Sequence, residues 1–213
     1  MKKLKVDQTT TLLYQVIMKA MNSSSRPTGG WSQGLLAAMN NPEVVIDSDD
    51  QLVVIKDKYP KALFHFLVLP KRNIPNLKSL TQKDLELLKH IHKKGEEIAN
   101  RANKELRFRL GYHAVPSMSH LHMHVISQDF NSPCLKNKKH WNSFNTHYFI
   151  DSVDLIREIE KTGHWKSDQA EMNAFLKKDL RCHVCKEVFQ TIPSLKAHIS
   201  LHDVTKHHDS SSS

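Results

Sequence analysis

The sequence predicts an α+β fold in which helices pack on an antiparallel meander sheet, followed by a small zinc-binding finger of the ββα type. β-rich runs separated by short turns in the first half of the chain predict the sheet. A pair of cysteines followed by a pair of histidines near the end predicts the finger. At 213 residues, the chain is long enough for one well-cored domain and a small appendage.

The first segment, residues 1–30, is expected to form a helix and a loop ahead of the main domain. Proline and two glycines within 23–30 oppose regular structure, so this stretch is predicted to be a loop that leads to Trp31. The helix is predicted from one apolar stripe at helical spacing, formed by Leu12, Leu13, Val16, Ile17, Ala20 and Met21.

Three β-rich runs follow at 44–46, 52–55 and 64–69, with turn-like residues such as 47–50 between them. Short runs of this kind, separated by short turns, are typical of antiparallel strands. We therefore expect a meander.

A long helix is predicted from Thr81, as its N-cap, to about Ala102, crossing the sheet. Two further strands are expected at 106–113 and 121–127, with Pro116 turning the chain between them, and another helix at about 153–160. The apolar face of the long helix is expected to comprise Leu85, Leu88, His92, Gly95, Ile98 and Ala102.

Composition narrows the classes of function. The formal charge of +9 and the pI of about 9.4 favour a polyanionic partner. No stretch approaches the roughly 20 apolar residues that a membrane helix needs, and the apolar run near the N-terminus is interrupted by Gln15 and Lys19, so neither a membrane nor secretion is expected. The three cysteines do not suggest a disulfide framework, which favours a reducing compartment.

Histidines alternate with hydrophobic residues over 120–126, which reads His-Leu-His-Met-His-Val-Ile. On a strand, this pattern places His120, His122 and His124 on one face and directs the intervening residues into the core. Three imidazoles together suit either a metal that activates water or nucleophilic attack on a phosphate, since a neutral ring is nucleophilic near pH 7. The residues alone leave both possibilities open.

The alternating run resembles the histidine-triad signature of nucleotide hydrolases and transferases. Segments 57–62, 110–119 and 127–144 resemble the aprataxin family within that superfamily, and the likeness extends from about Trp31 to His202. It implies a histidine-triad catalytic domain over 31–150. The residues themselves predict a connecting helical segment over 151–180, a finger over 181–203 and a disordered tail over 204–213.

The resemblance implies that His122 attacks the phosphorus of an adenylate and forms a covalent adenylyl-histidine, from which water releases AMP. His120 and His124 are expected to position the nucleophile and bind phosphate oxygens, with Ser117 hydrogen-bonding the phosphate. No metal is required for this chemistry.

Further substrate contacts are carried over from the family. Asp57 is assigned to the ribose hydroxyls, although a turn-capping carboxylate is the alternative. His65 is expected to line the site as a supporting residue, and Trp31 to stack on an exposed base pair unless it packs in the core. The other residues assigned to substrate or DNA are Lys58, Lys61, His113, Lys136, Lys138 and His140.

In the finger, Cys182 and Cys185 have two residues between them, twelve separate Cys185 from His198, and three separate His198 from His202. This is the spacing of a structural zinc site, and so short a unit folds only with metal, whose binding supplies on the order of 10 kcal/mol. Phe189 and Leu195 are expected to form its small core.

The usual base-reading positions of such a finger are occupied here by Thr191, Ser194 and Ala197, so weak sequence reading is expected. DNA-backbone contact by Lys186, Lys196 or the Ser194 hydroxyl is the expected role of the finger instead.

Together these features predict a nuclear, monomeric DNA-repair hydrolase that removes AMP from 5′-adenylated nicks and ends of double-stranded DNA, and from related nucleotide caps. The alternatives are a general dinucleotide or nucleoside phosphoramidate hydrolase and a non-catalytic single-finger DNA-binding protein. Vertebrate members of the family carry a forkhead-associated domain, for which the residues before Trp31 are too few. The sequence therefore gives no support for phosphopeptide-dependent recruitment, and it leaves open whether that domain was removed or never present.

Overall fold

The computed structural model describes residues 34–202. The predicted N-terminal helix and loop, Trp31 and the tail after the finger lie outside the described residues. Among the described helices, none has the length and apolar character needed to cross a membrane.

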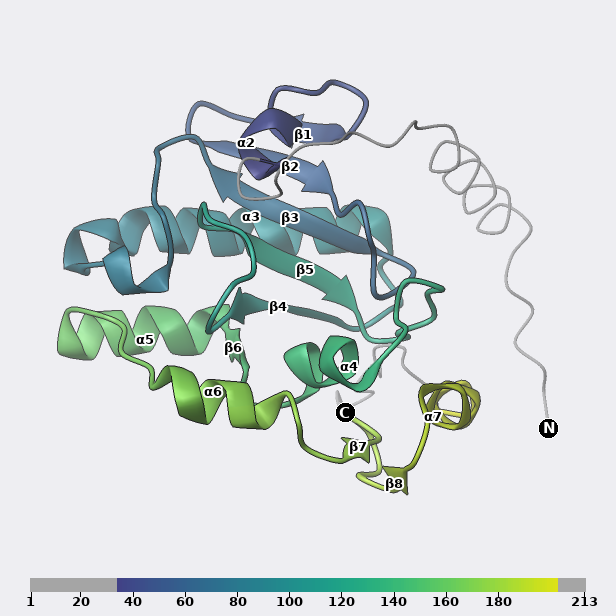
Figure 1. Ribbon diagram of the computed structural model, residues 1–213. Coiled ribbons are helices and arrows are strands. Elements are labelled where there is room, and N and C mark those ends of the chain that lie inside the picture. The colour runs from purple at the N-terminus through teal and green to yellow at the C-terminus, as the bar shows by residue number, and fades with distance from the viewer. Residues whose placement is uncertain (1–33, 203–213) are drawn as a thin grey trace, which may run out of the picture. The chain divides into compact units, whose positions relative to one another are not determined.

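A six-stranded sheet forms the centre of the domain, with the strand order β1-β2-β3-β5-β4-β6 (Figure 1). All neighbouring strands are antiparallel. The first three form the expected meander, but β5 inserts between β3 and β4, so the sheet as a whole is not a simple meander. The strands are β1 (Val45–Ser48), β2 (Leu52–Lys56), β3 (His65–Pro70), β4 (Phe108–His113), β5 (Met123–Ser127) and β6 (Phe149–Asp151).

The long helix, α3 (Leu85–Ala102), begins later than the sequence predicts. Two 3-10 turns precede it, η2 (Leu77–Ser79) and η3 (Gln82–Asp84). Thr81 caps η3 rather than α3, in a reciprocal capping box with Asp84.

The buried face of α3 is rotated relative to the expected one. His92 and Ala102 are only partly buried, whereas Ile91 and Ala99 are buried beside Leu88, Gly95 and Ile98. The helix approaches the sheet closely at Gly95, where an added Cβ would lie 2.4 Å from the Met123 side chain. His92 instead faces the neighbouring helix α5 (Ser152–Thr162), where its Nδ1 lies 2.7 Å from the Ser152 hydroxyl.

Helices cover both faces of the sheet. α3 and α5 share one apolar core with residues of β2, β3, β4 and β5. α4 (Lys138–Asn145) packs on the opposite face, while the short α2 (Gly34–Ala38) lies against β1 to β3 (Figure 1). The side chains on the α4 face belong to the candidate site described below.

The finger follows α6 (Gln169–Phe175) and has the expected ββα order, with β7 (Leu180–Arg181), β8 (Val188–Phe189) and α7 (Ile192–Ile199). Its apolar side chains do not form a separate core. Leu180, Leu195 and Ile199 pack in one cluster with Phe130 and Trp141 of the main domain. The Trp141 indole N–H also donates to the Arg181 carbonyl (3.0 Å), so the finger is an integral part of the domain.

Candidate active site

The three triad histidines are all buried, but only His124 lies within β5, which begins at Met123 rather than at Leu121. His120 has a left-handed backbone (φ 80°), and it takes the chain out of the ladder. The amides of His120 and Leu121 donate to the carbonyls of Pro75 and Ile74 rather than to a strand. The predicted single strand face is therefore wrong for His120 and His122, whereas the intervening hydrophobic residues enter the core as expected.

His122 is held in one tautomer by the backbone. Its Nδ1 lies 2.8 Å from the His120 carbonyl oxygen, which can only accept, so Nδ1 carries the proton. The Nε2 atom then has a free lone pair. Burial lowers the pKa of His122 below its usual value near 6.5, and the His120 hydrogen bond only partly opposes this effect. A neutral ring with unprotonated Nε2 has the form that nucleophilic attack requires.

His124 takes its tautomer from His65 on the adjacent strand β3. The Lys61 amide donates to His65 Nδ1 (3.2 Å), so the proton of the neutral ring is on Nε2. That atom lies 2.9 Å from His124 Nδ1, which accepts, and the His124 proton is therefore on Nε2. Burial lowers the pKa of His65 to about 4 and that of His124 well below its usual value, so both rings are neutral.

The His124 Nε2–H group is buried and has no hydrogen-bond partner among the described residues. A buried donor without a partner is costly, and such groups in native proteins commonly face a ligand. An anionic oxygen would satisfy it. His65 therefore has a definite supporting role in this geometry, because it makes His124 a donor.

The His120 ring makes a hydrogen bond to the backbone instead of to another histidine. Its Nε2 donates to the Pro70 carbonyl (2.7 Å), which leaves Nδ1 buried and without a partner among the described residues. The backbone carbonyl of His120, rather than its ring, contacts His122. The hydrogen bond between these two residues therefore involves the main chain of His120.

The aromatic rings of Phe144 and Phe149 pack against the histidines. The Phe144 ring packs against His65, His113 and His124, with ring centroids 5.4, 4.7 and 5.2 Å apart. His113 stacks on His124 at 4.4 Å, and burial lowers its pKa well below the usual value. The apolar surroundings explain why four histidines remain uncharged so close together.

Asp57 and Lys61 lie on the loop between β2 and β3. Asp57 Oδ1 accepts from the Tyr59 amide (2.7 Å), which is the turn-capping role that the sequence left open. Its other oxygen lies 3.6 Å from His65 Nδ1, so the carboxylate also borders the histidine cluster. Burial lowers the pKa of Lys61, and the charge of Asp57 opposes this shift.

The remaining predicted contacts surround this centre less closely. His140, near the start of α4, accepts at Nδ1 from the Lys136 amide (3.2 Å), and burial and then the charge of Lys61 lower its pKa. Lys138 pairs with Asp179 (3.8 Å), and the Lys58 ammonium lies over the Tyr59 ring. Lys136 and Ser117 are exposed, and no hydrogen bond joins Ser117 to a triad histidine among the described residues.

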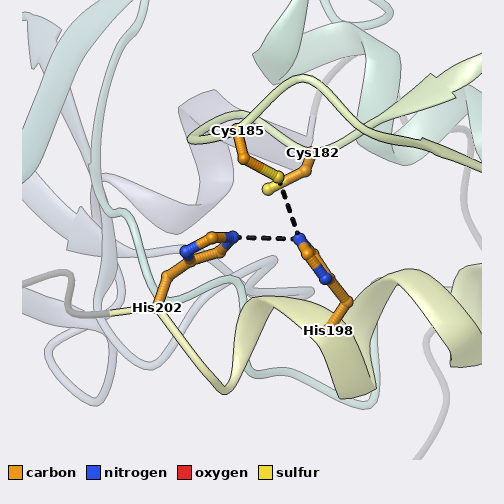
Figure 2. Close-up of side chains that lie close together, drawn as sticks. All are labelled: Cys182, Cys185, His198 and His202. Atoms are coloured by element: carbon orange, nitrogen blue, oxygen red, sulfur yellow. Dashed lines mark hydrogen bonds between the residues drawn. The ribbon is translucent and has the colours of Figure 1, made fainter.

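The four predicted zinc ligands converge (Figure 2). Cys182 and Cys185 come from the β7–β8 turn, and His198 and His202 from α7 and the residues just after it. One ligand atom from each lies within 4.8 Å of all the others. His198 Nε2 is 3.1 Å from Cys185 Sγ and 2.9 Å from His202 Nε2. Two sulfur and two nitrogen donors in this arrangement fit a tetrahedral zinc ion.

The other finger residues that the sequence assigned to DNA have partners within the protein. Lys186 Nζ donates to the His183 carbonyl (2.8 Å), and Lys196 Nζ donates to the Ser132 carbonyl of the main domain (2.8 Å). The Ser194 hydroxyl donates to the Thr191 carbonyl (3.0 Å) at the start of α7. In the structure, each of the three residues expected to contact the DNA backbone thus has a hydrogen-bond partner within the protein.

Several features of the site were not predicted from the sequence, among them the packing of Phe144 on three histidines and the contact of Lys196 with Ser132. Both join residues that lie far apart in the chain, and no local spacing indicates such contacts.

Two family models match the chain. Residues 30–140 match the scavenger mRNA decapping enzyme C-terminal binding family, and residues 145–203 match the C2HE / C2H2 / C2HC zinc-binding finger family.

Curated relatives extend over both parts. An aprataxin of Danio rerio is 52% identical over 180 residues, which is 84% of this chain and 55% of the relative. An aprataxin-like protein of Saccharomyces cerevisiae is 33% identical over 209 residues, covering 80% of this chain and 95% of the relative. The chain spans about half the length of the aprataxins from Danio rerio, Ciona intestinalis and Gallus gallus.

Solved structures share the fold. The crystal structure of an aprataxin ortholog in complex with DNA superposes with a TM-score of 0.66 at 24% identity, covering 80% of this chain and 94% of that one. The ortholog from Schizosaccharomyces pombe gives a TM-score of 0.60 at 23% identity, covering 85% and 93%.

Proposed function

Because the chain belongs to the aprataxin family of histidine-triad proteins, we propose that it is a DNA-repair hydrolase that removes AMP from 5′-adenylated DNA ends. The observation that carries the proposal is the tautomer of His122, whose Nδ1–H donates to the His120 carbonyl and whose Nε2 is free to attack. A neutral nucleophile in a buried site suits a phosphate centre without a catalytic metal.

In the first step, the lone pair of His122 Nε2 forms a bond to the adenylate phosphorus. The bond from that phosphorus to the 5′-phosphate oxygen of the DNA breaks, and the DNA leaves as a 5′-phosphate. The ring gains positive charge as the bond forms, and the His120 carbonyl, which accepts from Nδ1–H, stabilises it. The product on the protein is adenylyl-histidine.

The donor Nε2–H of His124 is placed to bind a non-bridging phosphate oxygen through both displacements, because His65 fixes its tautomer. In the second step, water attacks the phosphorus, the bond to His122 Nε2 breaks, and AMP leaves. His122 returns to its neutral state as the water proton is released.

The rest of the substrate extends over a basic border. Lys61 and Lys136 provide positive charge toward phosphates, the neutral ring of His140 lies beside Lys136, and Asp57 has the carboxylate for ribose hydroxyls. Ser117 and Trp31 keep their proposed roles at the phosphate and at an exposed base pair, although Trp31 lies outside the described residues. Structures of an aprataxin ortholog with DNA, one of them also with guanosine, support a DNA substrate, and we include related nucleotide caps in the proposal.

The zinc ion, when bound to Cys182, Cys185, His198 and His202, supplies structural cross-linking of the finger. We further propose that the protein acts as a monomer in the nucleus, where nicked and adenylated DNA ends arise.

Mass spectrometry of protein quenched during turnover of adenylated DNA tests the mechanism. One added AMP on the peptide that contains the triad is the expected result, and His122→Ala should abolish both this adduct and AMP release while DNA binding persists. Undiminished turnover by His122→Ala would overturn the proposal. A non-catalytic binding protein would show no AMP release in either form, and a general phosphoramidate hydrolase would prefer free dinucleotides to adenylated DNA.

A further inference from the structure

Lys196 is a basic residue of the finger helix whose side chain turns toward the main domain. Its Nζ donates to the Ser132 carbonyl at 2.8 Å, and the lysine is only partly exposed. Ser132 is buried, on the loop that precedes α4. The ammonium group thus forms a charge-assisted hydrogen bond that joins the finger to this loop.

Ser132 transmits this contact to the substrate loop. Its hydroxyl donates to the Pro60 carbonyl at 2.5 Å, and it also accepts from the Cys134 amide at 3.1 Å. Pro60 lies between Asp57 and Lys61, the two residues assigned to the ribose and the phosphate. The residue after Pro60 then donates its amide to His65 Nδ1 at 3.2 Å.

His65 completes the connection, because its Nε2 donates to His124 Nδ1 at 2.9 Å. Hydrogen bonds and single peptide links therefore form a continuous path from the finger helix to the last triad histidine. The path includes the Lys61 amide, which sets the tautomer of His65 and thereby the tautomer of His124.

We propose that Lys196 is a positioning residue for the hydrolytic reaction, acting through Ser132 and the 57–61 loop rather than by touching DNA. The inference rests on the proposed function, and it assigns the finger a part in forming the catalytic centre even for substrates too small to reach it. Displacement of the loop would move Asp57 and Lys61 and would loosen the bond that orients His65. Small misplacements of this kind reduce turnover strongly.

The decisive comparison is between a substrate with DNA and one without. We expect Lys196→Met to lower kcat by about tenfold on adenylated DNA and by the same factor on adenosine 5′-phosphoramidate, which has no DNA to contact the finger. Lys196→Arg should restore most of the rate, because its guanidinium can donate to the same carbonyl. Lys177→Met, which removes an equal charge from an exposed lysine beyond α6, should leave the phosphoramidate rate unchanged.

A structural measurement accompanies the rates. In zinc-loaded protein, hydrogen–deuterium exchange of the Lys61 amide should be faster in Lys196→Met than in wild type, because the hydrogen bond from the finger to Ser132 is lost. Ser132→Ala, which is remote from the zinc ligands in sequence, removes the hydroxyl bond to Pro60 and should give the same two effects. This variant decides the question if Lys196→Met binds zinc poorly.

Loss on adenylated DNA alone would identify Lys196 as a DNA contact and overturn the positioning role. Unchanged rates on both substrates and unchanged Lys61 exchange would overturn it as well. Failure of the wild-type protein to hydrolyse either adenylate would instead contradict the proposed function. The exchange experiment would still test whether Lys196 holds the 57–61 loop in place.

Discussion

The histidine cluster of the candidate active site and the predicted zinc site of the finger each bring two imidazole rings into close contact, yet the nitrogens that meet differ in protonation. His65 Nε2 faces His124 Nδ1 at 2.9 Å, so one nitrogen donates and the other accepts. His198 Nε2 faces His202 Nε2 at the same distance, with Cys185 Sγ 3.1 Å from the first of them. In the first pair a proton lies between the rings, whereas in the second the lone pairs converge on one point.

The difference originates in what each ring's other nitrogen contacts. In the catalytic centre, backbone groups define the tautomers, through the Lys61 amide at His65 and the His120 carbonyl at His122. In the finger, His198 Nδ1 faces the Glu187 carboxylate at 3.7 Å, which leaves Nε2 free for a metal. The second contact of each histidine therefore decides whether its free nitrogen has a lone pair, carries a donor hydrogen or is available for a metal.

Removal of zinc should have the largest effect and should separate the two centres. Without the ion, the finger loses binding energy on the order of 10 kcal/mol, and its apolar residues are shared with the main domain, so we expect early, broad unfolding. Thermal unfolding of Cys182→Ser, and of wild type with chelator, measures this. His122→Ala provides the control, because its unfolding should stay zinc-dependent like wild type; an unchanged Tm on zinc removal would show that the shared core suffices.

Acidification should lower the stability of the folded protein through the buried histidines of the candidate active site. The folded pKa of His65 is lowered to about 4 by burial, against about 6.5 in the unfolded chain, so the unfolded state binds more protons between these values. Stability is thus complete above about pH 6.5 and is lost as the pH falls toward 4, by roughly 3 kcal/mol from this ring. Urea unfolding at several pH values measures the slope.

His65→Gln should flatten that slope by up to one proton, since it removes the ring that must stay neutral. His90→Gln is the matched control for the loss of one imidazole ring, because His90 lies partly exposed beside Asp49, far from the triad in sequence. Equal slopes in wild type and His65→Gln would show that His65 does not remain neutral in the folded protein.

Loss of the His65 donor should reduce turnover by about ten- to a hundredfold, even where the fold is intact. His65→Phe keeps the ring shape against Phe144 but leaves His124 Nδ1 without its partner, so His124 can adopt the other tautomer. Nitrogen-15 spectra of the ring report the tautomer directly. An unshifted His124 spectrum together with full turnover would contradict the role assigned to His65.

These tests also mark what the sequence can predict. The predicted zinc ligands follow from local spacing, because two residues of a turn, one residue of α7 and one residue just after it supply all four. Alternation also predicts that the hydrophobic residues of the triad segment enter the core. It does not predict that β5 begins at Met123, since the left-handed backbone at His120 is stabilised by carbonyls of a distant loop.

The remaining catalytic contacts depend on topology. His65 and His124 are 59 residues apart, and they meet because β5 lies between β3 and β4 and so pairs with β3. Lys196 and Ser132 are 64 residues apart, and they meet because the finger shares its core with α4. Charge and motif mark Lys196 as a DNA contact from the sequence, whereas its position gives it a different partner.

The smallest expected effect concerns Lys136, an exposed lysine on the loop before α4. If Lys136 contacts a DNA phosphate, Lys136→Gln should weaken binding modestly and lower the slope of log K against log salt by about one, because one fewer counterion is released. Lys83→Gln, an equal change on η3 beside α3, should leave the slope as it is in wild type. Titrations of nicked DNA at several salt concentrations compare the two variants. Identical slopes would mean that Lys136 only faces solvent, and DNA would then have to be held by the catalytic centre and by residues nearer to it, such as Lys61 and His140.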